Sequence, residues 1–172
     1  MKSVALAAVA SLIALSLGAC AGMQDAQSDQ TTAQLMAVSD STIVPGLRAG
    51  RVFLGMSEEQ LYARLGSPFR SEVTDNGKNV LYYYPDLTVG VKSKTHQVGM
   101  IYVVGHSYST EGGVTVGVPE LAVKSMLGQP VAEFGDNRQR VFCYDGVEAL
   151  VKNGSINGLW VFPGACGKSV KS

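Results

Sequence analysis

Histidine is the side chain whose type best suits catalysis near neutral pH, and the 172-residue sequence has two. His96 lies in the polar run Lys92–Gln97, and His106 lies beside Ser107. Nucleophilic catalysis needs a hydroxyl or thiol within hydrogen-bond reach of the imidazole, and a carboxylate that orients the ring. The residues around Ser107 do not resemble a nucleophile elbow. The sequence therefore favours a protein that is not an enzyme.

Sites for metals, phosphate or nucleic acid are not indicated either. Cys143, Cys166 and the two histidines lack the spacing of a zinc-ligand set. Gly167-Lys168-Ser169 ends like a phosphate-binding loop, but Phe162 stands where that loop needs glycine, and too few residues follow for a helix. The 14 basic residues are balanced by 14 acidic ones, so the clustered positive charge that nucleic acid requires is missing. We expect no cofactor and no metal.

The N-terminus is typical of an export signal. Lys2 precedes the apolar run Val4–Leu17, which as a helix spans about 21 Å, less than the roughly 30 Å hydrocarbon core of a membrane. We therefore interpret residues 1–19 as a signal peptide. Leu17-Gly18-Ala19-Cys20 resembles the lipobox of bacterial lipoproteins, which implies cleavage before Cys20, a diacylglyceryl group on its sulfur and acylation of the new amino terminus. The alternative is an ordinary signal peptide followed by a chance cysteine.

The lipobox resemblance also implies a location. Two or three acyl chains anchor a protein stably, and Ala21, where some lipoproteins have aspartate, implies the outer membrane. We expect a lipid-anchored protein that faces the periplasm. Residues 20–49 are predicted to be a flexible tether because the first part of this segment is rich in Gln, Ser and Thr and poor in aromatics. A short helix around Thr32–Ala37 is the alternative.

With Cys20 assigned to lipid, Cys143 and Cys166 are left as a pair in an oxidising compartment. We predict a disulfide that ties the C-terminal tail, residues 164–172, to the strand containing Cys143. The alternative is a buried free Cys143 and an exposed free Cys166.

An internal repeat organises the rest of the sequence. Residues 52–68 align with residues 114–130 at a constant offset, with identical residues at Val52/Val114, Gly55/Gly117, Glu58/Glu120, Leu65/Leu127, Gly66/Gly128 and Pro68/Pro130. Each copy predicts a helix, at about 57–65 and about 119–127, that begins at Ser57 or Pro119 and ends at a glycine. Apolar runs and turn signals such as Asn153-Gly154 then predict antiparallel strands.

These features predict an α+β fold. Repeat 1 covers residues 50–105 and repeat 2 covers residues 106–163. Each repeat is expected to be a helix followed by an antiparallel meander, and the two are expected to form one layered sheet with both helices on one face.

The repeated unit resembles the BamE/SmpA-OmlA type of small envelope lipoprotein. The residues concerned are the motif Gly55-Met56-Ser57, then Gln60-Leu61 and Leu65-Gly66, followed by a Tyr-rich strand. Its tandem use is similar to the β-lactamase-inhibitor-protein (BLIP) fold. The resemblance covers about residues 50–163 and implies a domain that binds other proteins.

Aromatic residues are the candidates for binding a partner. In a strand, Tyr82 and Tyr84 share one face and Tyr83 the other, and Tyr102 and Trp160 add to the aromatic content of the sheet. We predict that some of Tyr82, Tyr84, Tyr102 and Trp160 form a protein-binding surface opposite the helices, while other aromatics are core. The sequence thus predicts a non-enzymatic adaptor or outer-membrane assembly factor with an envelope protein as partner. The alternative is a BLIP-like inhibitor of a periplasmic or secreted hydrolase.

Overall fold

The computed structural model describes residues 41–136 and 138–166. In this part of the chain lie two α-helices, α2 (Glu58–Leu65) and α3 (Glu120–Leu127), and a short 3-10 helix η1 (Asp75–Gly77). Among these described residues, no helix combines the length and the apolarity needed to cross a membrane. Cys20 and the predicted signal peptide lie outside the described residues.

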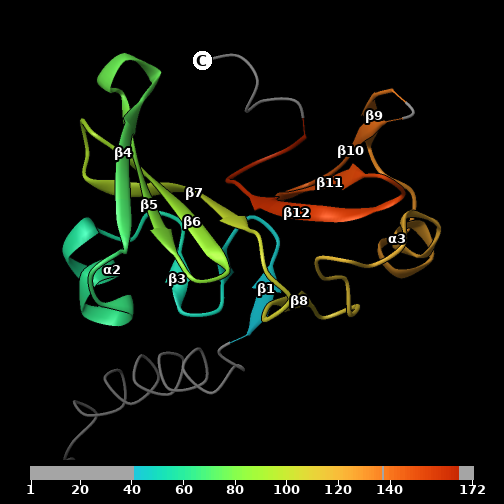
Figure 1. Cartoon of the computed structure of the whole chain (residues 1–172), viewed down its shortest axis with the longest axis horizontal. Helices are drawn as coiled ribbons and strands as arrows, with labels where there is room; N and C mark the ends of the chain where they lie inside the picture. Colours follow the sequence, from blue (N-terminus) through green and yellow to red (C-terminus); the bar gives the residue numbers. More distant parts are fainter. Residues whose placement is uncertain (1–40, 137, 167–172) are drawn as a thin grey trace, which may run out of the picture. The chain divides into compact units, whose positions relative to one another are not determined.

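Most of the structure is one antiparallel sheet of eight strands (Figure 1). From one edge to the other its strands are β4 (Arg70–Thr74), β5 (Asn79–Tyr84), β6 (Leu87–Lys92), β7 (Gln97–Val103), β12 (Ser155–Val161), β11 (Val147–Lys152), β10 (Gln139–Tyr144) and β9 (Ala132–Gly135). Two four-stranded meanders therefore meet at the pairing of β7 with β12, which is the middle of the sheet.

A second, smaller sheet was not expected from the sequence. Its four strands are β3 (Val52–Phe53), β2 (Arg48–Ala49), β1 (Thr42–Val44) and β8 (Ser109–Thr110), and β1 runs parallel to β8. β2 packs against β7 of the large sheet. The segment 42–49, which was predicted to belong to the tether, therefore forms two strands of the folded body.

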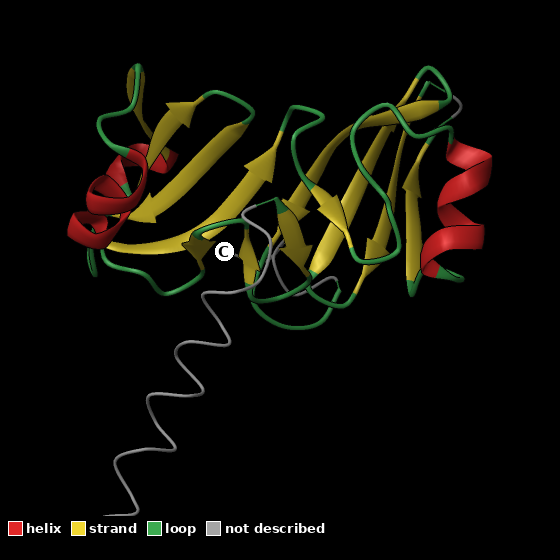
Figure 2. Cartoon of the chain, turned by 90° about the horizontal axis from the view of Figure 1, so that it is seen from below, coloured by secondary structure: helices red, strands yellow, loops and turns green. Residues whose placement is uncertain are grey.

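The predicted α+β class with one layered sheet is wrong. Of the residues that the structure describes, strands account for 46% and helices for 15%, so this part of the chain is mostly β. Twelve strands form two sheets in the described part of the chain. The two helices lie at opposite ends of the eight-stranded sheet (Figure 2). Much of the core is therefore covered by the second sheet rather than by the helices.

Both helices begin and end for local reasons. Ser57 and Gln60 form a capping box, in which each side chain accepts from the other residue's backbone N–H. Pro119 precedes α3 and has no side-chain hydrogen bond to offer. Gly66 and Gly128 follow the helices with φ of 76° and 80°, a conformation that residues with a Cβ rarely adopt, so each helix stops at its glycine.

The segments that begin at Gly55 and Gly117 make matching contacts with the large sheet. The N–H of Gly55 donates to the carbonyl of Val98 across 2.8 Å, and that of Gly117 donates to the carbonyl of Ile156 across 2.7 Å. The sequence-derived repeat boundaries at 50–105 and 106–163 stay predictions.

The start of each helix is bound to the tip of a hairpin. The N–H of Glu58 donates to the carbonyl of His96 across 2.9 Å, and that of Glu120 donates to the carbonyl of Gly154 across 2.8 Å. His96 lies in the turn between β6 and β7, and Gly154 in the turn between β11 and β12. These hairpin turns hold the first turn of α2 and of α3 in place.

The large sheet has two unlike faces. Its inner face packs on both helices and the second sheet in one core cluster. The strand residues of this face are almost fully buried, and they include Tyr82, Tyr84, Val89, Ile101, Phe142, Tyr144, Ala149, Leu159 and Val161. Because side chains alternate along a strand, the residues between them form the outer face.

Candidate functional site

One row of directly paired residues crosses the outer face of the eight-stranded sheet. Residues opposite one another in a sheet lie on the same face, so the register defines the row without further assumption. From β4 to β10 it consists of Arg70, Tyr83, Thr88, Tyr102, Trp160, Glu148 and Cys143, and we call it the outer row.

The centre of the outer row is an aromatic pair. The rings of Tyr102 and Trp160 meet edge to face, with centroids 5.4 Å apart and planes at 75°. Trp160 is 40% exposed. Gly158 makes room for this arrangement, because a Cβ at that position would overlap the Tyr102 ring. A large aromatic surface is thus held in a fixed orientation and left accessible at the junction of the two meanders.

The outer row ends in polar side chains on β4 and, on β10, in a cysteine at disulfide distance from Cys166. On β4, the guanidinium of Arg70 lies 4.8 Å from the centroid of the Tyr83 ring, and the Tyr83 hydroxyl donates to Glu72 across 3.1 Å. At the other end, burial raises the pKa of the Glu148 carboxyl. An apolar centre with a polar margin is the usual composition of a protein-binding surface.

The structure separates the four aromatic residues that were predicted to bind a partner. Tyr102 and Trp160 lie on the outer face, but Tyr82 and Tyr84 are 7% and 6% exposed on the inner face. The prediction is therefore wrong for Tyr82 and Tyr84. Their hydroxyls are used inside the fold, since Tyr82 donates to Glu58 and Tyr84 to the carbonyl of Gly66. Tyr83, which the prediction left out, lies in the outer row.

Cys143 and Cys166 lie at disulfide distance, with Cα atoms 5.6 Å apart. Cys143 is fully buried, and the N–H of Cys166 donates to Asp145 across 3.3 Å. The bridge joins the tail to the outer-face side of β10, as the register of Cys143 with Glu148 shows. Cys166 therefore borders one end of the outer row.

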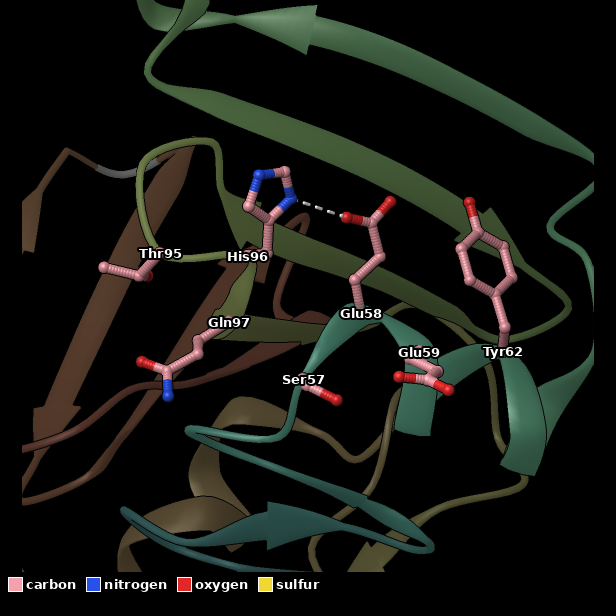
Figure 3. Close-up of a pocket in the computed structure, with 7 residues that line it drawn as sticks. All are labelled: Ser57, Glu58, Glu59, Tyr62, Thr95, His96 and Gln97. Carbon is pink, nitrogen blue, oxygen red and sulfur yellow. Dashed lines mark hydrogen bonds and ion pairs between the residues drawn. The ribbon is translucent and has the colours of Figure 1, made fainter.

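A second cluster was not anticipated from the sequence. An open pocket beside the start of α2 is lined by Ser57, Glu58, Glu59, Tyr62, Thr95, His96 and Gln97 (Figure 3). The Nδ1 atom of His96 lies 3.0 Å from Oε2 of Glu58. Figure 3 shows the Glu58 carboxylate between the His96 and Tyr62 side chains. Glu58 and His96 are 38 positions apart in the sequence. They meet because the hairpin turn binds the start of the helix, and the sequence alone does not show this contact.

His106 and Ser107 have separate partners. The Nδ1 atom of His106 lies 2.8 Å from the carbonyl oxygen of Val116, and the hydroxyl of Ser107 donates to Asp86. These contacts join the segment after β7 to neighbouring turns. They are structural contacts, and we assign neither residue to the candidate site.

Comparisons with known proteins reveal remote likenesses of structure. No protein-family profile matches the sequence, and no curated protein matches it. An extracellular protein containing an SCP domain from Bacillus anthracis is 15% identical, with a TM-score of 0.48 over 64% of this chain and 44% of that one. A DUF4309 family protein from Bacillus subtilis is 17% identical, with a TM-score of 0.47 over 69% of this chain and 88% of that one. A candidate β-lactamase inhibitor protein from Streptococcus mutans is 15% identical, with a TM-score of 0.29 over 78% of this chain and 95% of that one.

These likenesses do not establish a family or a function. The chain spans 44% and 49% of two of the matched proteins, which is less than half of their length. One of the matches, the candidate β-lactamase inhibitor protein, corresponds to the predicted resemblance to BLIP. The TM-score of that match is 0.29, which is too low to support an argument. The predicted resemblance to BamE has no support beyond the sequence motif itself, since no family profile matches.

Proposed function

We propose that this chain is an exported, lipid-anchored envelope protein that binds another protein through the outer face of its large sheet. In this account the signal peptide ends at Ala19, and acyl chains on Cys20 hold the protein at the outer membrane, facing the periplasm. The folded body is an adaptor or assembly factor rather than an enzyme. The lipobox-like residues 17–20 support the anchor, and the outer row supports the binding role.

The Tyr102–Trp160 pair is the observation on which the binding role rests. Trp and Tyr contribute more binding free energy than most residues when a partner covers them, because they bury large areas and lose little side-chain entropy. Trp160 is 40% exposed, its ring contacts Tyr102, and both lie at the centre of an eight-stranded sheet. A rigid sheet presents such residues without an ordering cost at the moment of binding.

The partner surface is expected to be apolar at its centre. The aromatic pair supplies little charge, whereas Arg70 and Glu72 lie at the β4 end of the outer face. A complementary partner therefore places apolar side chains over Trp160 and polar groups near the margin.

Site-specific photocrosslinking in living cells tests the proposal. A photoreactive phenylalanine analogue replaces Trp160 in one variant and Leu121 in another. Leu121 is the matched control because it is a large apolar residue, 91% exposed, on α3 rather than on the outer face. We expect one defined crosslinked envelope protein from position 160 and none from position 121. A crosslink from position 121 with none from position 160 overturns the proposal.

The same experiment separates the two kinds of protein-binding role. If the crosslinked partner is a hydrolase whose activity falls on binding, the chain is an inhibitor. If the partner is a subunit of an outer-membrane complex that retains its activity, the chain is an adaptor.

The anchor is tested separately with Cys20→Ser. Because only a lipidated Cys20 carries the acyl chains, we expect this variant to leave the membrane fraction and to lose incorporation of labelled fatty acid. An unchanged membrane fraction contradicts the anchor while leaving the binding role of the outer face intact.

A further inference from the structure

The two helix starts differ in how their first carboxylate is neutralised. In the second half of the chain, Glu120 forms an ion pair with Arg140, and only 13% of the Glu120 side chain is exposed. The guanidinium of Arg140 lies 5.9 Å from the centroid of the Phe142 ring, and the Lys124 ammonium lies 4.9 Å from the same centroid. The chain thus supplies its own cations to this carboxylate and ring.

The first half carries the same carboxylate without those cations. β5 and β10 correspond because Tyr84 and Tyr144 both bind the glycine that ends the neighbouring helix. This correspondence matches four positions of the first half with four of the second. The pairs are Glu58 with Glu120, Val80 with Arg140, Tyr62 with Lys124 and Tyr82 with Phe142. The position of the internal guanidinium is therefore taken by an uncharged side chain.

The space beside Glu58 is open. The pocket has a volume of about 570 Å³, and none of its described lining residues is a lysine or an arginine. Tyr62, which is 36% exposed, packs edge to face on Tyr82 with ring centroids 5.6 Å apart. One wall of the pocket is thus an accessible aromatic side chain fixed by a buried neighbour.

The surroundings of the Glu58 carboxylate favour its charged form. The hydrogen bond from Tyr82, together with His96, lowers the pKa of Glu58 below its ordinary value. Its side chain is 25% exposed, so water screens it less than a fully exposed group. A carboxylate accepts about four hydrogen bonds, and Tyr82 and His96 account for two. The Glu58 carboxylate can therefore accept hydrogen bonds from a further donor.

We propose that this pocket binds the guanidinium group of an arginine supplied by another molecule, with Glu58 as the anion and Tyr62 as the aromatic wall. The external guanidinium takes the role that Arg140 plays toward Glu120. A planar guanidinium suits the site because it forms paired hydrogen bonds with a carboxylate and stacks on an aromatic ring. The site is separate from the outer row, so it does not depend on the proposed function.

Nuclear magnetic resonance of the full-length protein with isotope-labelled histidine rings tests this site. His96 contacts Glu58 and reports on the pocket, whereas His106 contacts Val116 and serves as the control within the same molecule. Methylguanidinium is the probe, and methylurea is its uncharged counterpart of the same shape. We expect a saturable shift of the His96 signals with methylguanidinium, little shift with methylurea and no shift of His106. Equal shifts from both compounds, or equal shifts of both histidines, overturn the proposal.

Substitutions test whether the pocket residues are responsible for the shift of the His96 signals. Glu58→Gln removes the charge and is expected to weaken methylguanidinium binding about tenfold, while Glu120→Gln, its counterpart in the second half, leaves binding unchanged. Val80→Arg supplies an internal guanidinium in the manner of Arg140 and is expected to abolish the His96 shift. Unchanged His106 signals verify folding of each variant. Binding that persists in both Glu58→Gln and Val80→Arg overturns the proposal.

The source of the guanidinium is distinguished by two further ligands. Arginine blocked at both ends mimics a protein side chain, and free arginine is the small molecule. Stronger binding of the blocked form supports a partner protein as the source, and stronger binding of the free form supports a small guanidino compound.

Discussion

The hydroxyl of Tyr144 donates to the carbonyl oxygen of Gly128 across 3.1 Å. Gly128 is the residue at which α3 ends, and Tyr144 is the last residue of β10. The contact therefore ties the end of a helix to the inner face of the sheet. Tyr84 makes the equivalent contact with Gly66 across 3.3 Å in the first half of the chain. One tyrosine in each half thus satisfies a helix-terminal carbonyl that the helix itself leaves without a donor.

Removing either hydroxyl should destabilise the fold by a similar amount. Tyr84→Phe and Tyr144→Phe each remove the hydroxyl that donates to a helix-terminal carbonyl, so we expect each to lower the free energy of unfolding by about 1 kcal/mol. Chemical denaturation followed by circular dichroism measures this. Tyr83→Phe on the outer face is the control, with a smaller expected loss. Equal losses in all three variants would show that the helix ends do not depend on these contacts.

Glycine at position 158 should be required for the aromatic pair. In Gly158→Ala the new Cβ overlaps the Tyr102 ring, which must then rotate away from Trp160. Since Trp160 is the single tryptophan, its fluorescence should change in emission wavelength, and crosslinking from the outer face should fall. Gly90→Ala is the matched control, because its Cβ meets the flexible Met100 side chain at 2.7 Å. Identical spectra for Gly158→Ala and the wild type would contradict the described packing of the pair.

The disulfide should contribute to stability. Cys143 and Cys166 are 23 residues apart, and closing a loop of this length stabilises a fold by about 3 kcal/mol in the chain-entropy model. We expect a reductant to lower the denaturation midpoint of the wild type and to leave Cys166→Ser unaffected. A wild type that does not respond to reductant would argue against a stabilising bridge.

Two carboxylates should give opposite dependences of stability on pH. The hydrogen bond from Tyr82 lowers the pKa of Glu58 below 4.5, so the stability that Glu58 contributes above that pH is lost as the pH falls through the lowered pKa. Burial raises the pKa of Glu148 above 4.5, so stability falls as the pH rises from 4.5 through the raised pKa.

Denaturation midpoints of Glu58→Gln and Glu148→Gln across this pH range test both signs. Glu58→Gln should have a flatter acid limb than the wild type. Glu148→Gln should gain stability relative to the wild type as the pH rises toward neutrality, because it no longer carries a partly buried charge. Two variants with parallel pH profiles would show that neither carboxyl is perturbed as described.

The parts of the fold that depend on local sequence were predicted closely. Ser57, Gly66, Pro119 and Gly128 mark helix ends, and the helices run from Glu58 to Leu65 and from Glu120 to Leu127. The second sheet was missed because Arg48–Ala49, Val52–Phe53 and Ser109–Thr110 are too short to show a period of two. That omission is why the fold class was predicted as α+β rather than mostly β.

The candidate sites were predicted less well, because they depend on tertiary packing. Alternation places Tyr82 and Tyr84 on one face, but only packing determines that this face is the buried one. Likewise the contact of Glu58 with His96 depends on the hairpin turn that binds the start of α2. No local motif signals such a contact.

Hydroxyl-radical footprinting of Trp160 tests the central claim most directly. The oxidation rate of this side chain is measured in native envelopes and in the purified full-length protein, with Leu121 as the reference because it is 91% exposed and lies on α3 rather than on the outer face. If a partner covers the outer face, Trp160 should be oxidised several-fold more slowly in envelopes, while Leu121 is oxidised at the same rate in both. Equal rates for Trp160 in both preparations would contradict the claim that this face binds a protein.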